Sequence, residues 1–123
     1  MVIFVFSKGR MTVNKDFHVK KSAEIEKIIQ AKISVGDQYF VVYRRENHDN
    51  LHMRFAISVP KKYGNAVERN LMKRRVREVV SKLAFHNQYD FFIVVKPSSS
   101  ILDFQQISDD LYKLFARAKI LEV

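Results

Sequence analysis

One segment, Val59 to Phe85, constrains the fold of this chain more than any other. It opens on a turn signal, Tyr63-Gly64-Asn65, in which Asn65 can cap a helix because its side-chain oxygen accepts from free backbone N–H groups. With residues spaced about 100° apart, five apolar side chains share one arc. These are Met72, Val76, Val79, Val80 and Leu83. The pattern predicts an amphipathic helix that packs this stripe against a core.

The same helix carries most of the positive charge. The segment holds eight lysines and arginines against two glutamates, in a chain whose formal net charge is +9. One flank of the helix has no acid: Arg69, Asn70, Lys73, Arg74 and Arg77. A solvated basic face is the bland interpretation. A flank without acids, however, forms no i,i+4 salt bridges and repels itself, and a phosphate backbone would relieve that repulsion.

Composition narrows the class of protein. A chain of 123 residues with 47% hydrophobic and 28% charged residues is typical of one globular domain. A pI near 9.9 indicates an acidic partner, nucleic acid before an anionic membrane surface. The absence of cysteine excludes disulfides, thiolate zinc sites and cysteine nucleophiles, and it fits a reducing compartment, so we expect a cytoplasmic protein. No stretch approaches the roughly 20 apolar residues of a membrane span.

The N-terminal stretch differs from the rest. Residues 1–10 are apolar, but they lack a basic n-region and the apolar run is too short for a signal peptide. We interpret residues 1–17 as an extension, disordered or the result of a mis-assigned start, before a domain over residues 18–120. Alternation over residues 2–6 also allows an extra edge strand, which is the less favoured interpretation.

The remaining pattern predicts three strands. Residues 38–44 and 53–59 are rich in β-branched and aromatic residues and alternate in polarity, and Pro60 ends the second run. We expect these two runs to form an antiparallel hairpin. Residues 89–95 are almost continuously apolar, which predicts a central strand that is buried on both faces.

Two further helices complete the predicted order α-β-β-α-β-α. The first covers residues 22–30, with Ser22 as its cap. The last begins at Asp103, where Gln106 completes a capping box. Its buried face holds Ile107, Leu111, Leu114, Phe115 and Ala118.

Residues 58–74 read SVPKKYGNAVERNLMKR, and this run closely resembles the protein subunit of bacterial ribonuclease P. That family carries a pattern of the form K-K-x-G-N-A-V-x-R-N-x-x-K-R, and the likeness extends roughly over residues 19–118. The resemblance implies an α+β fold: a single-domain two-layer α/β sandwich with about four strands in a mixed sheet and three helices. It also implies a left-handed βαβ crossover through the basic helix, although a right-handed one is the general rule. A fourth, short strand would lie at an end of the chain or in a connection.

The function implied by the resemblance is that of a non-catalytic protein subunit of an endoribonuclease. Such a subunit binds the catalytic RNA subunit and precursor tRNA, and it promotes removal of the 5′ leader to make the mature tRNA 5′ end. No catalytic residue and no metal site are then expected on this chain, because RNA-bound magnesium ions would activate water and stabilise the leaving oxygen. Neither a membrane nor a small-molecule substrate is expected as a partner.

The resemblance also implies two sets of site residues. The contacts with the RNA subunit are Lys61, Lys62, Asn65, Arg69, Asn70, Lys73 and Arg74, to which the acid-free flank adds Arg77. The contacts with the single-stranded leader, in a cleft between the first helix and the sheet, are Ile25, Ile29, Val41 and Tyr43. Alternation along the strand adds Tyr39 to this second set. Plain core is the alternative interpretation of the Tyr39 face, although two tyrosine hydroxyls favour a partly wet surface.

Two departures from the family pattern affect these sets. Leu71 stands where a second arginine is common, which removes one possible phosphate contact. Ile25 and Ile29 stand where phenylalanines are common, and aliphatic side chains cannot stack on bases as aromatic rings do, a contribution of about 1–3 kcal/mol per base.

Three other functions stay open. A general RNA-binding or ribosome-assembly protein would share the basic helix but would bind RNA equally well with or without a 5′ extension. A protein-only nuclease could use histidine and lysine as acid and base. A zinc site at His48 and His52 would need these residues on a helix, which their surroundings do not indicate.

Overall fold

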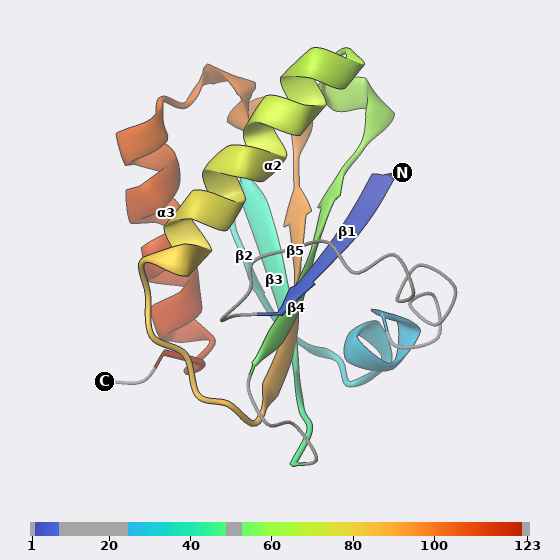
Figure 1. Ribbon diagram of the computed structural model, residues 1–123, viewed down its shortest axis with the longest axis vertical. Coiled ribbons are helices and arrows are strands. Elements are labelled where there is room, and N and C mark those ends of the chain that lie inside the picture. The colour runs from blue at the N-terminus through green and yellow to red at the C-terminus, as the bar shows by residue number, and fades with distance from the viewer. Residues whose placement is uncertain (1, 8–24, 49–52, 122–123) are drawn as a thin grey trace.

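The protein folds around one mixed β-sheet. The structure, a computed structural model, describes residues 2–7 (as backbone only), 25–48 and 53–121. Its strands are β1 (Val2–Ser7), β2 (Ile33–Gly36), β3 (Phe40–Glu46), β4 (Arg54–Val59) and β5 (Tyr89–Val95). They lie in the order β1-β4-β5-β3-β2 (Figure 1). This arrangement confirms the predicted α+β class.

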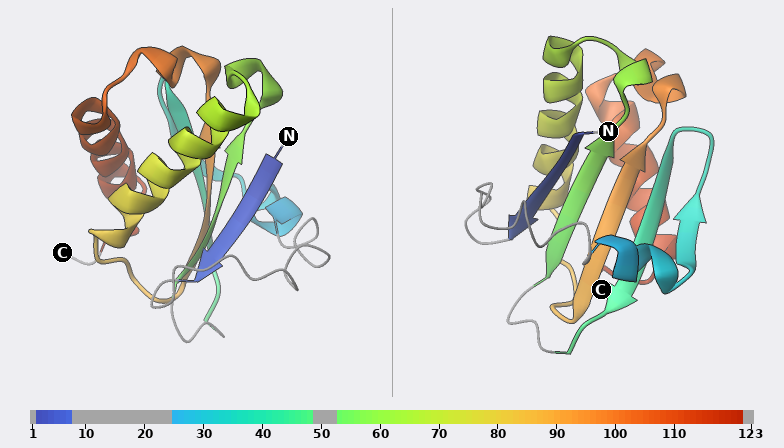
Figure 2. Two further views of the ribbon diagram at one scale, coloured as in Figure 1. Left: turned by 45° about the horizontal axis from the view of Figure 1, so that its top comes forward. Right: turned by 90° about the vertical axis from the view of Figure 1, so that its right-hand side faces the viewer.

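Helices cover both faces of this sheet. The two long helices, α2 (Ala66–Ser81) and α3 (Phe104–Arg117), lie together on one face, and the helical residues 25–30 lie on the other (Figures 1 and 2). Short 3₁₀ turns, η1 (Lys61–Tyr63) and η2 (Pro97–Ile101), follow β4 and β5. The three predicted helices are therefore present, and the predicted cap Ser22 of the first one lies outside the described residues.

The crossover between β4 and β5 is left-handed. These two strands are parallel, whereas all the other neighbouring strands are antiparallel. In the right-hand view of Figure 2 both strands point upward at the front, α2 lies behind them, and β5 is to the right of β4. This hand is the one that the family resemblance implied and the opposite of the general rule.

The predicted hairpin between the first two strands is wrong. β3 and β4 do not pair, because β5 lies between them and pairs with both. The apolar sequence of β5 is buried on both faces, and such a strand belongs in the middle of a sheet. The hairpin partner of β3 is β2, a four-residue strand in the connection after the first helix.

The sheet has five strands, where about four were predicted. β2 is the short strand expected in a connection, and residues 2–7 form the additional strand β1, paired antiparallel with β4. The edge-strand alternative therefore describes residues 2–7, in place of the favoured disorder. The predicted domain boundary at residues 17–18 lies outside the described residues.

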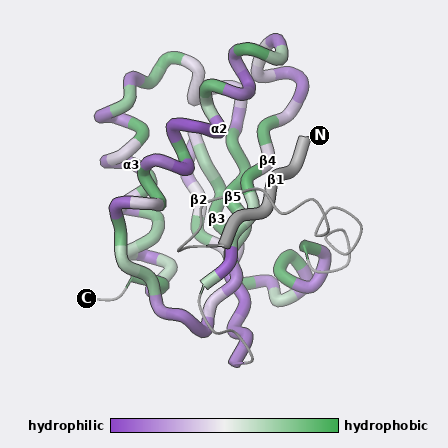
Figure 3. The backbone as a smooth tube through the Cα atoms, in the orientation of Figure 1, coloured by the Kyte–Doolittle hydropathy of each residue, from purple (hydrophilic) through white to green (hydrophobic). Residues whose placement is uncertain are grey.

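The main core fills the space between the sheet and the two long helices. Four residues of the predicted α2 stripe are buried there: Met72, Val76, Val79 and Val80. They meet an aromatic group in which the rings of Phe55 and Phe85 stack on Phe91, with centroids 5.4 and 4.9 Å away. Figure 3 shows hydrophobic residues concentrated along the central strands, while hydrophilic and hydrophobic residues alternate along α2. The amphipathic pattern that predicted α2 thus orients it in the fold.

A buried ion pair ties β4 to β5. The guanidinium of Arg54 donates to both carboxylate oxygens of Asp90, at 3.1 and 2.8 Å, and Asn47 donates to the same carboxylate at 3.2 Å. Asp90 is therefore the acceptor that joins two strands and the segment after β3.

Candidate nucleic-acid interface

The start of α2 is held by a closed set of hydrogen bonds. The Asn65 side chain accepts from the Glu68 N–H at 2.9 Å, and the Glu68 carboxylate accepts from the Asn65 N–H at 3.1 Å. This is a capping box, so the predicted role of Asn65 as N-cap is confirmed. A Cβ at Gly64 would lie 2.8 Å from Oε1 of Glu68, so glycine there leaves room for the returning carboxylate.

The predicted RNA contacts differ in exposure. Five of them are exposed on η1 and on the outward side of α2: Lys61, Lys62, Asn65, Asn70 and Arg74. Arg69 and Arg77 are half-buried, and Nη1 of Arg69 donates to the Gly64 carbonyl at 2.8 Å. Arg69 therefore stabilises the turn before α2 while it contributes charge to the surface.

Lys73 is the exception in this set, because only 6% of it is exposed. Burial, together with the positive charge of Arg69, lowers the pKa of its ammonium group to about 8. The helical wheel placed Lys73 on the acid-free flank but gave no sign that the flank is covered there. A direct phosphate contact by Lys73 would require its side chain to move.

A second surface lies on the opposite face of the sheet, beside the helical residues 25–30. A small cluster is buried there: Ile25, Ile28, Ala56 and Phe92, with Tyr43 and Val94 packed against it. Two predicted leader contacts, Val41 and Tyr43, are half-buried on this face. The Tyr43 ring stacks on Phe92 with centroids 6.2 Å apart. Among the described residues of this apolar surface, Tyr43 is the accessible aromatic side chain. We call the set Ile25, Ile28, Tyr43, Ala56, Phe92 and Val94 the second cluster.

The two predicted isoleucine contacts have different surroundings. Ile25 is buried in the second cluster, whereas Ile29 is 41% exposed. Ile25 therefore anchors the helix on the sheet, and Ile29 is the residue of this pair that a ligand can reach.

Tyr39 does not belong with this surface. It precedes β3 in a turn where the N–H groups of Tyr39 and Phe40 donate to Oδ1 of Asp37, at 2.8 and 3.0 Å. Strict alternation fails in such a turn, and Tyr39 packs against the main core on the α3 side. The structure thus brings Val41 and Tyr43 together and places Tyr39 on the other face.

Sequence reasoning missed the part of this surface that comes from β5. Phe92 and Val94 pair with Tyr43 and Val41 of β3, so their side chains share one face of the sheet. Alternation within residues 89–95 contains this signal, because Phe91, Ile93 and Val95 face the main core. Without the strand order, residues 89–95 are simply apolar throughout, and the sequence does not show which of them face the second surface.

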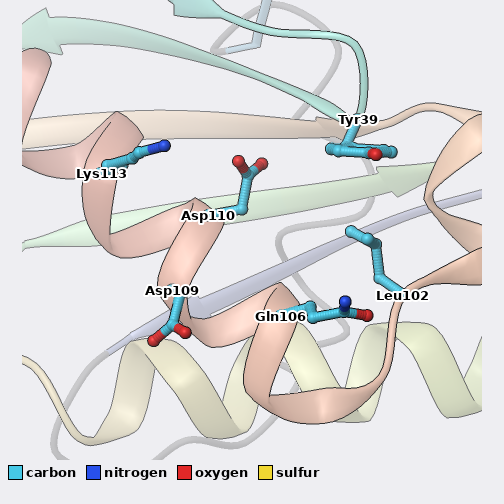
Figure 4. A pocket seen from close by; sticks show the side chains of 6 residues that line it. All are labelled: Tyr39, Leu102, Gln106, Asp109, Asp110 and Lys113. Carbon is cyan, nitrogen blue, oxygen red and sulfur yellow. The ribbon is translucent and has the colours of Figure 1, made fainter.

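Tyr39 instead lines a pocket of about 280 Å³ against α3 (Figure 4). The other lining residues are Leu102, Gln106, Asp109, Asp110 and Lys113. Burial and a hydrogen bond to Asp37 raise the pKa of Asp110 to about 6. Burial acts to raise the pKa of Asp37 too, but hydrogen bonds from Asp110 and two backbone N–H groups, with the charge of Lys96, hold it below its usual value. The buried Oδ2 of Asp110 meets no donor among the described residues, so a proton on Asp110 lets the pair share a hydrogen bond.

Other features bear on alternative functions. Within residues 2–7, 25–48 and 53–121, no three His, Cys, Asp or Glu side chains gather in a way that could hold a metal ion. His48 is exposed, 3.5 Å from Glu46, while His18 and His52 lie outside the described residues. Over the same part of the chain, no helix is long and apolar enough to cross a membrane.

Comparison with known proteins places these surfaces in a family context. A family model described as Ribonuclease P matches residues 13–119. The ribonuclease P protein component of Acholeplasma laidlawii is 41% identical over 108 residues, which cover 86% of this chain and 92% of that protein. That of Phytoplasma australiense is 34% identical over 89% of this chain and 96% of its own.

Solved structures agree with these sequence relatives. The RNase P protein of Staphylococcus aureus superposes with a TM-score of 0.74 at 33% identity, covering 81% of this chain and 93% of its own. The RNase P protein of Thermotoga maritima superposes with a TM-score of 0.71 at 27% identity, covering 78% of this chain and 92% of its own.

Proposed function

Since the chain belongs to the ribonuclease P protein family, we propose that it binds a catalytic RNA subunit through η1 and α2 and the 5′ leader of precursor tRNA on the second cluster. In this role it acts in the cytoplasm and promotes endonucleolytic removal of the leader. The two surfaces lie on opposite faces of one sheet, so both RNA partners can bind at the same time.

The observation that carries the proposal is the placement of the family-matching residues 58–74. They form the end of β4, then η1, then the first half of α2. Exposed Lys61, Lys62 and Arg74 extend from this unit, and the only acid among these residues, Glu68, is occupied in the capping box. Such a surface attracts phosphates, and binding should weaken steeply as salt rises because counterions are released.

The second surface suits single-stranded nucleic acid. A base can stack on the half-buried ring of Tyr43, which packs beside Phe92 on the neighbouring strand, while Ile29 and Val41 offer apolar contact to sugars. Stacking depends little on base identity, so the leader would be held without strict sequence preference.

We assign bond cleavage to the RNA subunit, whose bound magnesium ions would activate water and stabilise the leaving oxygen. The residues of this chain then act by binding and orientation. Phosphate contacts from η1 and α2 fix the protein on the RNA subunit, and the second cluster positions the leader so that its junction with the tRNA is presented for cleavage.

The test is cleavage of precursor tRNA at low magnesium by a bacterial ribonuclease P RNA, with and without this protein. The proposal expects cleavage at the mature 5′ end only when both are present. Equal binding of RNA duplexes with and without a 5′ extension, together with no effect on cleavage, would favour the general RNA-binding function. Cleavage by the protein alone would mean that the chemistry lies in the protein.

A further inference from the structure

The outward side of α2 carries two large apolar residues one turn apart. Val67 is 76% exposed and Leu71 is 44% exposed. Residues four apart on a helix are neighbours, so the two side chains form a continuous strip. Single exposed apolar residues are ordinary on protein surfaces, but two large ones side by side on one helix suit contact with a partner.

Cations and amides lie beside this strip, and the two acids of α2 have partners: Glu68 is in the capping box and Glu78 is 3.5 Å from Lys82. Arg74 follows Leu71 by three residues and is exposed on the same side of α2, as is Asn70. Lys61 and Lys62 are exposed on η1, immediately before the helix. Because Lys73 is buried and Arg69 is half-buried, the accessible surface of α2 is centred on this outward side, nearer to Val67 and Leu71 than the acid-free flank indicated.

We propose that Val67 and Leu71 contact the ribose and base of an unpaired nucleotide in the RNA subunit, while Arg74 and the η1 lysines bind phosphates on either side. This inference rests on the proposed function and deepens it. Ribose carbons and base faces are the apolar parts of RNA. Each ribose is bonded directly to the phosphates that the cations would bind. Unpaired nucleotides in loops and bulges expose these parts, whereas a duplex conceals its base faces.

The charges around the strip favour RNA over a second protein. Two aliphatic side chains provide far less than the roughly 1,200–2,000 Å² that a stable protein interface buries. A second copy of this chain would also bring Lys61, Lys62 and Arg74 against the same cations. A polyanion with apolar segments meets both properties of this surface.

The inference predicts that Leu71 and Arg74 affect binding in different ways. Binding of the isolated RNA subunit is measured for Leu71→Ala, Val67→Ala and Arg74→Ala across a range of salt concentrations. Leu71→Ala is expected to lower affinity about tenfold at every salt concentration, because it removes apolar burial without removing charge. Arg74→Ala is expected to reduce the slope of log K against log salt by about 0.7–0.9.

A matched control is Tyr112→Ala, which removes a side chain that is 50% exposed on α3, away from this strip. It is expected to leave both affinity and slope unchanged. Alanine is a strong helix former, so the variants should fold, and equal circular dichroism and melting temperatures confirm this.

Three outcomes would overturn the inference. The first is an affinity for Leu71→Ala equal to that of the wild type while Arg74→Ala still weakens binding; it removes the apolar contact and leaves the proposed function standing. The second is a self-association, seen by sedimentation, that Leu71→Ala abolishes without affecting RNA binding; it assigns the strip to a second copy. The third is no binding of the RNA subunit by the wild-type protein, in which case the proposed function fails as well.

Discussion

The two faces of the sheet use the same strands for different purposes. On one face, α2 and α3 cover a continuous core in which the aromatic rings of Phe55, Phe91 and Phe115 are fully buried. On the other face, the small second cluster leaves Tyr43 half-buried beside Phe92. Alternation along β5 thus places one phenylalanine in the core and the next beneath a candidate binding surface. From this difference we expect that stability and binding can be changed separately, one face at a time.

The largest expected effect comes from removing a core side chain on the face that α2 and α3 cover. Phe91→Ala removes a fully buried ring that stacks on Phe55 and Phe85. It should lower the free energy of unfolding by about 3–5 kcal/mol, since both burial and packing are lost. Urea denaturation measures this, and a loss below about 1 kcal/mol would contradict the packing described for the main core.

The next effect belongs to the outer surface of η1 and α2. Replacing Lys61, Lys62 and Arg74 together by alanine removes three exposed cations without changing the core. The slope of log K against log salt for the RNA subunit should fall by about 2, and affinity at low salt should fall roughly a hundredfold. An unchanged slope would show that these side chains do not meet phosphates. Replacing the exposed Lys113 and Lys119, on α3 and just after it, provides the control.

A smaller effect is expected on the opposite face. Tyr43→Ala should weaken binding of precursor tRNA to the reconstituted complex by about 1–3 kcal/mol, the range for loss of one stacked base. Binding of mature tRNA, which has no leader, should not change. Phenylalanine keeps the aromatic ring and lacks only the hydroxyl, so Tyr43→Phe should retain most of the affinity. Equal losses for both tRNAs would remove the second cluster from leader binding.

The smallest effect concerns the Asp37–Asp110 pair beside α3. The pKa of Asp110 is raised to about 6 in the folded protein, so the stability that its proton supplies is complete below the unfolded value near 3.9 and is lost as pH rises through 6. Asp37, whose pKa is lowered, acts in the opposite direction and only at lower pH. Lys96 contacts the Asp37 carbonyl, and Lys113 and Asp109 flank Asp110 in the pocket.

Thermal denaturation between pH 4.5 and 7.5 tests this pair. The wild type should lose on the order of 1 kcal/mol across that range from this site. Asp110→Asn can donate to Asp37 at every pH, so its stability should depend less on pH and should exceed that of the wild type at pH 7.5. The same pH dependence in both proteins would show that Asp110 does not titrate in this range.

Local features were predictable from the sequence, because their partners are close along the chain. The N-cap at Asn65, the capping box at Asp103, the buried stripe of α2 and the alternation along β4 all depend on neighbours within a few positions. Strand order was not predictable, because β5 enters between β3 and β4 only after α2 has crossed the sheet. The residues of β3 and β4 give no local signal that β5 lies between them. The left-handed crossover was predicted from the family resemblance alone.

The candidate site could be predicted where the direction in which a side chain leaves its helix or strand decides whether that side chain is exposed. Alternation correctly paired Val41 with Tyr43, but the Asp37 turn breaks it before Tyr39. A helical wheel gave the direction of Lys73 but not what covers it. The contribution of Phe92 required the register between β3 and β5, which only the folded sheet supplies.

The central claim is that the two faces bind two different RNAs, and one reconstitution experiment tests it directly. Affinity for the RNA subunit and the preference for precursor over mature tRNA are both measured for Arg74→Ala and for Tyr43→Ala. The two-face account predicts that Arg74→Ala weakens only the first quantity and that Tyr43→Ala reduces only the second. If either variant lowers both quantities by the same factor, the two surfaces do not act separately and the account is wrong.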